Sequence, residues 1–272
     1  MSTTRTAEAS DGRRLLLRSW EPTGPVRASV VILHGLGEHS GRYEHVGRAF
    51  ADAGLAPIAV DFRGFGGSEG RRAFVKEFSE YLADVQVAMD EAAGRGLPVV
   101  LLGHSLGGLV ALAYAQDREG VDYLVLSSPA LDAAIPAPKR IAARVLRRIL
   151  PKLTLANGIT ADQLSRDPSV GEAYFADPLV YTKTTAALGG AFLSAMAAAR
   201  ARKVPFPALV ILGEQDTLVP PAFSAPLATR PGVDRVTFPD FHHESFNEEG
   251  GTTAIGVVIG WIDGQLAQRA SG

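Results

Sequence analysis

Residues 99–108 read Val99-Val100-Leu101-Leu102-Gly103-His104-Ser105-Leu106-Gly107-Gly108. The four leading apolar residues indicate a buried strand, and Leu106 to Gln116 is typical of a helix. Gly-His-Ser-Leu-Gly joins them, which is the pattern of a sharp turn that exposes a serine hydroxyl. Side chains two positions before and after Ser105 would collide in such a turn, and glycine at 103 and 107 removes them. The segment therefore predicts a nucleophile elbow.

Strands and helices alternate on both sides of the elbow. Strands are expected at residues 15–20, 28–33, 56–60, 99–102, 123–126, 208–213 and 233–238, and helices at 44–53, 78–93, 106–116 and 247–269. No strand is assigned to the polar segment 1–14. This alternation predicts an α/β protein with a mostly parallel sheet that is covered by helices on both faces.

The alternation is interrupted between Leu131 and about Pro207. This segment contains no clear buried strand, and helices are expected at residues 138–150 and 184–203. We therefore expect a core formed by residues 1–130 and 207–272, with residues 131–206 inserted as a helical cap over the sheet.

Composition excludes several classes of protein. The chain has 272 residues, 46% hydrophobic and 21% charged, and its net charge is −2, which argues against a general nucleic-acid binder. It has no cysteine, so disulfides, thiolate catalysis and cysteine-based zinc sites are excluded. No apolar run is long enough to cross a bilayer, and residues 1–14 lack the apolar centre of a signal peptide. We expect a cytoplasmic protein, with peripheral membrane contact and the oligomeric state left open.

A serine hydroxyl becomes a nucleophile only when a base takes its proton. An acid and a histidine should follow Ser105 in that order. Asp216 follows the strand at 208–213, and His243 follows the last strand, so both belong to the sheet edge where active sites of α/β proteins assemble. In this interpretation His243 is the general base and then the general acid, while Asp216 orients its ring and stabilises the imidazolium.

Other residues compete for these roles. Asp132 is an alternative acid, although solvent exposure or capping of the insertion is the more ordinary role for it. His242 is an alternative base, because sequence does not show which of two adjacent histidines points into the site. His34 and His104 are expected to be structural, and Glu244, Asn247 and Glu248 are expected to cap the closing helix.

An oxyanion hole needs two backbone N–H donors. The residue after the nucleophile, Leu106, is one, and Leu36 in the Gly35 loop after an earlier strand is the other. Residues 243–247 do not form H-E-x-x-H, and the glycine-rich residues 64–68 lack the ending of a phosphate loop. The sequence therefore predicts neither a metal nor a cofactor.

The first helix of the insertion has one basic and one apolar side. The basic residues are Lys139, Arg140, Arg144, Arg147, Arg148 and Lys152, and the apolar ones are Ile141, Val145, Leu146, Ile149 and Leu150. Such a helix fits a membrane surface. It equally fits an ordinary cap helix whose apolar stripe faces the core.

Several of these segments together resemble one family. They are H-G-L-G-E-H-S-G-R-Y at 34–43, D-F-R-G-F-G-G-S-E-G at 61–70, G-H-S-L-G-G at 103–108, G-E-Q-D-T-L-V at 213–219 and H-E-S-F-N-E at 243–248. The chain, including the cap stretch 144–179, resembles the monoacylglycerol lipase and lysophospholipase group of α/β-hydrolases. In this chain His242 replaces the aromatic residue that precedes the family's catalytic histidine.

The resemblance implies an eight-stranded, mostly parallel sheet with a helical cap inserted after the sixth strand. It also implies a triad of Ser105, Asp216 and His243, an oxyanion hole of Leu36 and Leu106, and a mobile cap that opens an apolar tunnel to membranes or micelles. The expected reaction is cleavage of a monoacylglycerol to fatty acid and glycerol through an acyl-enzyme. A lysophospholipase, a general carboxylesterase and a non-catalytic binder of a small hydrophobic ligand remain the alternatives.

Overall fold

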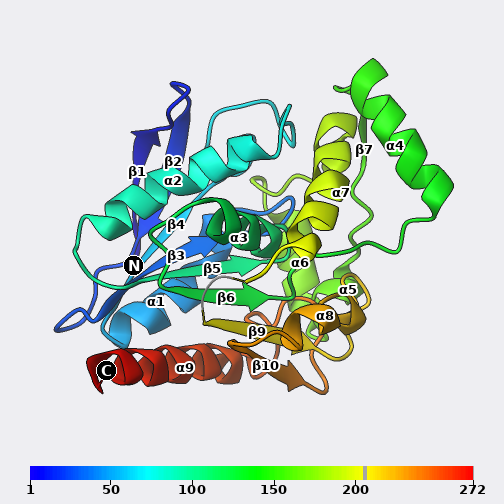
Figure 1. Ribbon diagram of the computed structural model, residues 1–272. Coiled ribbons are helices and arrows are strands. Elements are labelled where there is room, and N and C mark those ends of the chain that lie inside the picture. Colours follow the sequence, from blue (N-terminus) through cyan, green and yellow to red (C-terminus); the bar gives the residue numbers. More distant parts are fainter. Residues whose placement is uncertain (205–206, 272) are drawn as a thin grey trace.

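The computed structural model describes residues 1–204 and 207–271 and is built around an eight-stranded sheet (Figure 1). Its spatial order is β1-β2-β4-β3-β5-β6-β9-β10. β1 and β2, and β2 and β4, pair antiparallel, and the remaining neighbours are parallel. The strands are β1 (Thr3–Glu8), β2 (Arg14–Ser19), β3 (Ala28–Leu33), β4 (Leu55–Val60), β5 (Val99–His104), β6 (Tyr123–Ser127), β9 (Ala208–Gly213) and β10 (Val233–Phe238).

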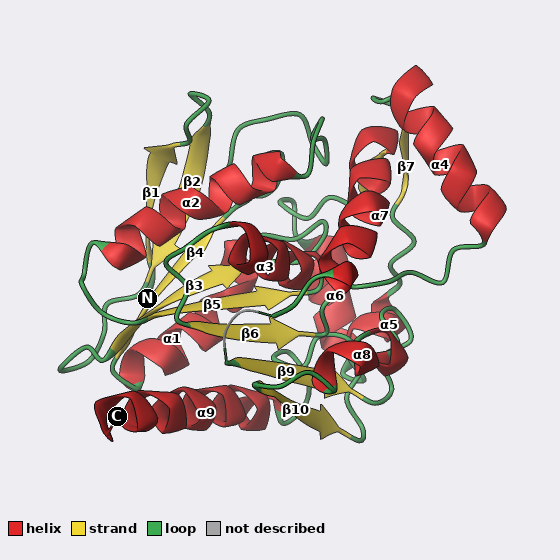
Figure 2. Ribbon diagram, viewed as in Figure 1, coloured by secondary structure: helices red, strands yellow, loops and turns green. Residues whose placement is uncertain are grey.

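Helices cover both faces of this sheet, with α2 and α3 on one face and α1 and α9 on the other (Figure 2). In β5 the side chain of Leu101 joins the core on the α2 and α3 side, whereas Val100 and Leu102 join the core on the α1 and α9 side. Alternate residues of a strand point to opposite faces, so a strand buried on both faces is apolar throughout. The core helices are α1 (Glu44–Asp52), α2 (Ser79–Ala93), α3 (Leu106–Asp117), α8 (Ala225–Ala228) and α9 (Gly251–Ser271), with 3-10 turns η1 (Ser40–Tyr43) and η2 (Pro221–Phe223).

The part of the chain between β6 and β9 that forms helices and strands lies beyond the carboxyl ends of the parallel strands (Figure 1). It contains α4 (Ala137–Ile149), β7 (Thr154–Ala156), α5 (Ala161–Leu164), α6 (Pro168–Ala176), β8 (Lys183–Thr185) and α7 (Ala186–Ala201). β7 and β8 form a separate antiparallel ribbon. The expected end of the insertion falls at residues 205–206, which lie outside the described residues.

Three details differ from the sequence-based expectations. Residues 3–8, to which no strand was assigned, form the edge strand β1, because backbone pairing with β2 needs no apolar face. The closing helix begins at Gly251 rather than at residue 247, and Gly250 before it has a φ of +89°. The β7–β8 ribbon and the short helices α5 and α6 lack the periodicity that would have revealed them.

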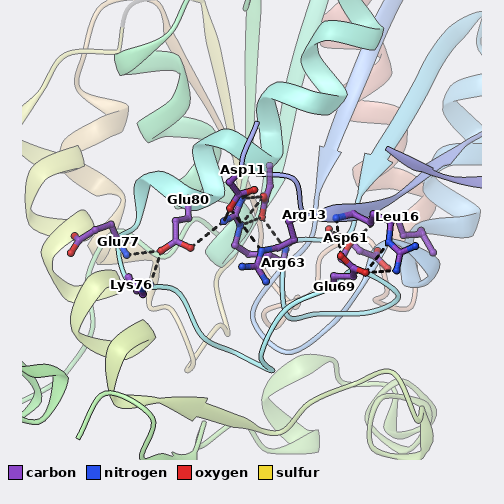
Figure 3. Close-up of polar contacts among 12 residues, drawn as sticks. Asp11, Arg13, Leu16, Asp61, Arg63, Glu69, Lys76, Glu77 and Glu80 are labelled. Carbon is purple, nitrogen blue, oxygen red and sulfur yellow. Dashed lines mark hydrogen bonds and ion pairs between the residues drawn. The ribbon is translucent and has the colours of Figure 1, made fainter. Parts of the chain in front are cut away.

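The turn after β4 is held by a buried arginine (Figure 3). Arg63 Nε donates to Asp84 of α2 at 2.8 Å, and its Nη1 donates to Asp11 of the β1–β2 turn at 2.8 Å and to Glu80 at 3.1 Å. In the same turn the Asp61 carboxylate accepts from the backbone N–H groups of Ser40 and Gly67. The glycine-rich residues 64–68 are therefore a tight structural turn, as the sequence indicated.

Candidate active site

Ser105 occupies a strained backbone position between β5 and α3. Its φ is 53° and its ψ is −113°, which is an unfavourable conformation for a residue with a side chain. A Cβ atom at Gly103 would lie 2.2 Å from the Gly107 carbonyl oxygen, and one at Gly107 would lie 2.2 Å from the Leu33 carbonyl oxygen. The elbow therefore requires glycine on both sides of the serine, for the steric reason expected.

Asp216 and His243 form a buried pair. His243 Nδ1 lies 2.7 Å from Asp216 Oδ2, and Asp216 Oδ1 accepts from the N–H groups of Leu218 at 2.9 Å and Val219 at 2.7 Å. An ionised carboxylate can only accept, so His243 Nδ1 carries the proton and Nε2 has a free lone pair. The pair thus presents a base at Nε2, with the carboxylate held rigidly behind it.

His243 and Ser105 line the same small cavity, together with Gly35 and Leu36 of the loop after β3. Ser105 and Leu36 also line a second, larger cavity of about 290 Å³. Its walls are mostly apolar and come from both the core and the inserted segment. The core contributes Leu106 and Leu218, and α7 contributes Leu188, Phe192 and Met196. Ser105 therefore lines both the small cavity that it shares with His243 and the larger apolar chamber.

The alternative acid and base are both engaged with other partners. The Asp132 carboxylate is paired with Arg140 at 2.8 Å and with Arg200, so it joins α4 to α7. His242 is partly exposed, and its Nδ1 is hydrogen-bonded to the Asp162 carbonyl at 2.9 Å. Asp216 and His243 are thus the residues that the structure brings together.

An ion-pair clamp beside the site was not anticipated. Arg42 donates to both carboxylate oxygens of Glu244 at 2.6 and 2.8 Å and to Glu38 at 2.6 Å. The other Glu38 oxygen accepts from the Gly35 N–H at 2.5 Å and from the Tyr43 hydroxyl at 2.7 Å. These three charged residues, which we name the Arg42 clamp, join the loop of Leu36 to the residue that follows His243.

The expectation that Glu244, Asn247 and Glu248 cap the closing helix is wrong. Glu244 belongs to the Arg42 clamp, and Asn247 donates to Glu244 at 2.8 Å. The Glu248 carboxylate accepts from the His242 N–H at 2.6 Å and from the Ser165 hydroxyl at 2.9 Å. The contacts of Glu244 with Arg42 and of Glu248 with Ser165 link segments more than 80 positions apart, so no local pattern of residues could have indicated them.

Two buried histidines, His34 and His104, pack next to the site. His34 Nε2 accepts from the Phe62 N–H at 2.9 Å, which is the structural role expected for it. The His104 ring packs 4.7 Å from the His243 ring, and its Nδ1 lies 3.2 Å from the Ser127 hydroxyl. Burial and the neighbouring His243 ring lower the pKa of His104 to about 3, and burial lowers the pKa of His34.

These histidines should make the fold sensitive to mild acid. Below its ordinary pKa of 6.5, His104 binds a proton in the unfolded chain but stays neutral in the folded protein until about pH 3. The free energy of unfolding therefore has its full contribution from neutral His104 above pH 6.5. Below that pH the contribution falls by about 1.36 kcal/mol per pH unit, or about 2 kcal/mol by about pH 5. Urea unfolding across this range should show the decline in the free energy of unfolding. In His104→Gln the slope of this free energy against pH should be smaller by about 1.36 kcal/mol per pH unit, which corresponds to one proton. An unchanged slope in this variant would contradict the assignment.

The sheet, the serine elbow after β5 and the Asp216–His243 pair at the ends of β9 and β10 together define an α/β-hydrolase. The chain belongs to the serine aminopeptidase S33 family, which matches residues 24–250.

Individual relatives are similar over 63% to 94% of the chain. The monoacylglycerol lipase of Mycolicibacterium smegmatis is 37% identical over 266 residues, which cover 94% of this chain and 95% of that protein. The Homo sapiens monoglyceride lipase is 39% identical over 180 residues, which cover 63% of this chain and 58% of that protein. The crystal structure of Paleococcus ferrophilus monoacylglycerol lipase superposes with a TM-score of 0.83 at 32% identity, covering 91% of this chain and 97% of that one.

Proposed function

We propose that this chain hydrolyses monoacylglycerols to a free fatty acid and glycerol. The observation that carries the proposal is the position of Ser105, which lines a small cavity together with His243 and also lines the apolar chamber. Similarity to a monoacylglycerol lipase over 94% of the chain supports the choice of substrate. At about 290 Å³ the chamber is near the lower end of ligand pockets, about 300 Å³, which suits one acyl chain better than two.

In the proposed mechanism His243 Nε2 takes the proton of the Ser105 hydroxyl as Oγ attacks the ester carbonyl carbon. The backbone N–H groups of Leu36 and Leu106 stabilise the resulting oxyanion, and the Asp216 carboxylate stabilises the imidazolium. The intermediate collapses to an acyl-enzyme, and His243 gives its proton to the departing glycerol oxygen. A water then loses a proton to His243, attacks the acyl carbon and releases the fatty acid, and the proton returns to Ser105.

We further propose that residues 131–206 act as a cap over this site. α7 supplies Leu188, Phe192 and Met196 to the apolar chamber, and the backbone carbonyl of Leu164 in α5 accepts from the Glu244 N–H at 2.8 Å. Movement of the inserted segment would therefore open the chamber and loosen the histidine loop together.

Rates on three esters test the choice of substrate. We expect 1-monoacylglycerol to be hydrolysed with a higher kcat/KM than lysophosphatidylcholine, which carries a bulky charged headgroup. A short nitrophenyl ester should react but should gain little from the apolar chamber. A preference for lysophosphatidylcholine would favour the lysophospholipase alternative, and equal rates on all three would favour a general carboxylesterase.

We propose that α4 contacts membrane surfaces. Ile141 is 60% exposed and Ile149 is 68% exposed, and no residue of α4 is buried. An ordinary cap helix would bury this stripe, so the exposed arrangement supports the membrane-surface interpretation. No helix within residues 1–204 and 207–271 has both the length and the apolar character needed to cross a membrane. Contact would be peripheral, and a cytoplasmic location stays a prediction.

Replacing Ile141 and Ile149 with serine should weaken binding to phosphatidylcholine vesicles by about tenfold or more, because each exposed side chain contributes roughly 1 kcal/mol on insertion. Co-sedimentation measures the change. Hydrolysis of the short nitrophenyl ester, which needs no membrane, serves as the control and should be retained. Equal vesicle binding by the variant would show that α4 is not the contact surface.

A further inference from the structure

A basic groove lies between the cap and the core, away from Ser105. Its volume is about 690 Å³, and it is bounded by α4, by α7 and by the segment that leads into α2 (Figure 1). Phe74, Val145, Pro151 and Ala187 form apolar parts of its wall. Its charged lining consists of Lys76, Glu77, Arg144, Arg147, Arg148 and Lys152. We name this site the basic groove.

The charge in the basic groove is not compensated by the described residues. Arg147 donates to Glu77 at 2.8 Å and to the Lys76 carbonyl at 2.6 Å. Within residues 1–204 and 207–271, Lys76, Arg144, Arg148 and Lys152 form no ion pair with a carboxylate. Five cations face one acid in a chain whose total charge is −2, so positive charge is concentrated here. Such a concentration raises the local affinity for anions.

The surroundings of the basic groove indicate what kind of anion it binds. Val145 belongs both to its wall and to the exposed apolar stripe of α4, which continues through Ile149 and Leu150. A ligand that fills both must carry negative charge next to apolar chains. Guanidinium and ammonium groups are the usual protein partners of phosphate. An anionic phospholipid in a bilayer has this combination, because its phosphate lies at the level where a surface helix inserts.

We propose that the basic groove binds the phosphate of an anionic phospholipid headgroup when α4 rests on a membrane. The proposal rests on the membrane contact proposed above and adds a defined headgroup site to it. Because Lys76 comes from the core and Arg144 and Arg148 from the cap, one phosphate would bridge the two parts of the chain. Membrane charge would thereby act on the position of the cap over Ser105.

A pair of matched variants separates a specific site from general attraction. Lys76→Gln and Lys139→Gln each remove one exposed positive charge, but Lys76 lines the basic groove, whereas Lys139 lies on α4 outside its lining. Lys76→Gln should weaken binding to vesicles of phosphatidylcholine with phosphatidylglycerol by about tenfold or more, the effect of losing a charge-assisted hydrogen bond. Lys139→Gln should weaken it by no more than about fivefold, as expected for charge near a membrane surface. Co-sedimentation gives both values, and thermal unfolding checks that each variant is folded.

The other outcomes are also decisive. Equal weakening by the two variants would overturn the headgroup site and leave general electrostatic attraction by α4. Tight binding of inorganic phosphate or glycerol 3-phosphate, with no preference for anionic over neutral vesicles, would identify a soluble phosphate ligand and overturn the lipid assignment. If the wild-type chain binds no vesicle, the headgroup site and the membrane contact of α4 both fail. The hydrolase proposal is tested separately with the nitrophenyl ester, so its failure is distinguishable.

Discussion

Replacing Ser105 with alanine should lower monoacylglycerol hydrolysis by at least about 10⁴-fold, because the proposed acyl-enzyme has no other oxygen on which to form. The loss should appear in kcat, while the melting temperature should not fall, since alanine removes only a hydroxyl from the strained elbow. A fluorophosphonate probe, which labels activated serines, should modify the wild-type chain at Ser105 and leave Ser105→Ala unlabelled. Peptide mapping by mass spectrometry identifies the labelled residue.

Matched variants of the neighbouring residues complete this test. His243→Ala should approach the loss seen for Ser105→Ala, whereas His242→Ala should keep activity within about tenfold of wild type, since the His242 ring is engaged with the Asp162 carbonyl. Asp216→Asn should also cause a large loss, because the amide favours the wrong histidine tautomer. Absence of label on Ser105 in the wild-type chain would favour a non-catalytic protein that binds a small hydrophobic ligand.

The fold could be predicted because its decisive signals are local. The apolar run at 99–102, the glycines at 103 and 107, and the alternation of strands and helices each reflect steric or burial demands within a few residues. The predicted eight-stranded sheet is confirmed. Seven of its strands were expected from their own residues, whereas β1 is formed by a segment without strand periodicity. An edge strand exposed to solvent has no apolar face to produce such periodicity.

The candidate site was only partly predictable, for a related physical reason. Ser105, Asp216 and His243 each follow a strand, so the parallel sheet alone indicates that they meet at one edge. The Arg42 clamp depends instead on a contact between residues 202 positions apart, and the same residue types would serve equally well as helix caps or exposed charges. The exposure of α4 was equally hidden, because an amphipathic helix has the same sequence pattern whether its apolar side meets a core or a membrane.

Arg42→Ala should destabilise the fold by about 3–5 kcal/mol, because it leaves two buried carboxylates without their shared cation. Burial alone would raise the pKa of Glu38, but the Arg42 guanidinium and the hydrogen bond from the Tyr43 hydroxyl lower it from its ordinary 4.5 to about 2. The Glu38 carboxylate therefore stabilises the wild-type fold above pH 4.5, and that contribution is lost as the pH falls towards 2. Without Arg42 the pKa of Glu38 should rise, so urea unfolding should give a flatter profile across this range.

The same substitution should also lower kcat by roughly ten- to a hundredfold, because Glu38 holds the Gly35 N–H and Glu244 directly follows His243. Arg42→Lys separates the two effects: it keeps a cation between the carboxylates but cannot form the paired hydrogen bonds to Glu244. We expect this variant to recover most of the lost stability while kcat remains depressed, as measured on the soluble nitrophenyl ester. Full recovery of kcat would mean that the clamp supplies charge balance alone. A depressed kcat in a stable Arg42→Lys variant would instead show that the hydrogen-bond geometry of the Arg42 clamp aligns the loop of Leu36 with His243. One guanidinium would then position both the oxyanion donor of that loop and the catalytic base.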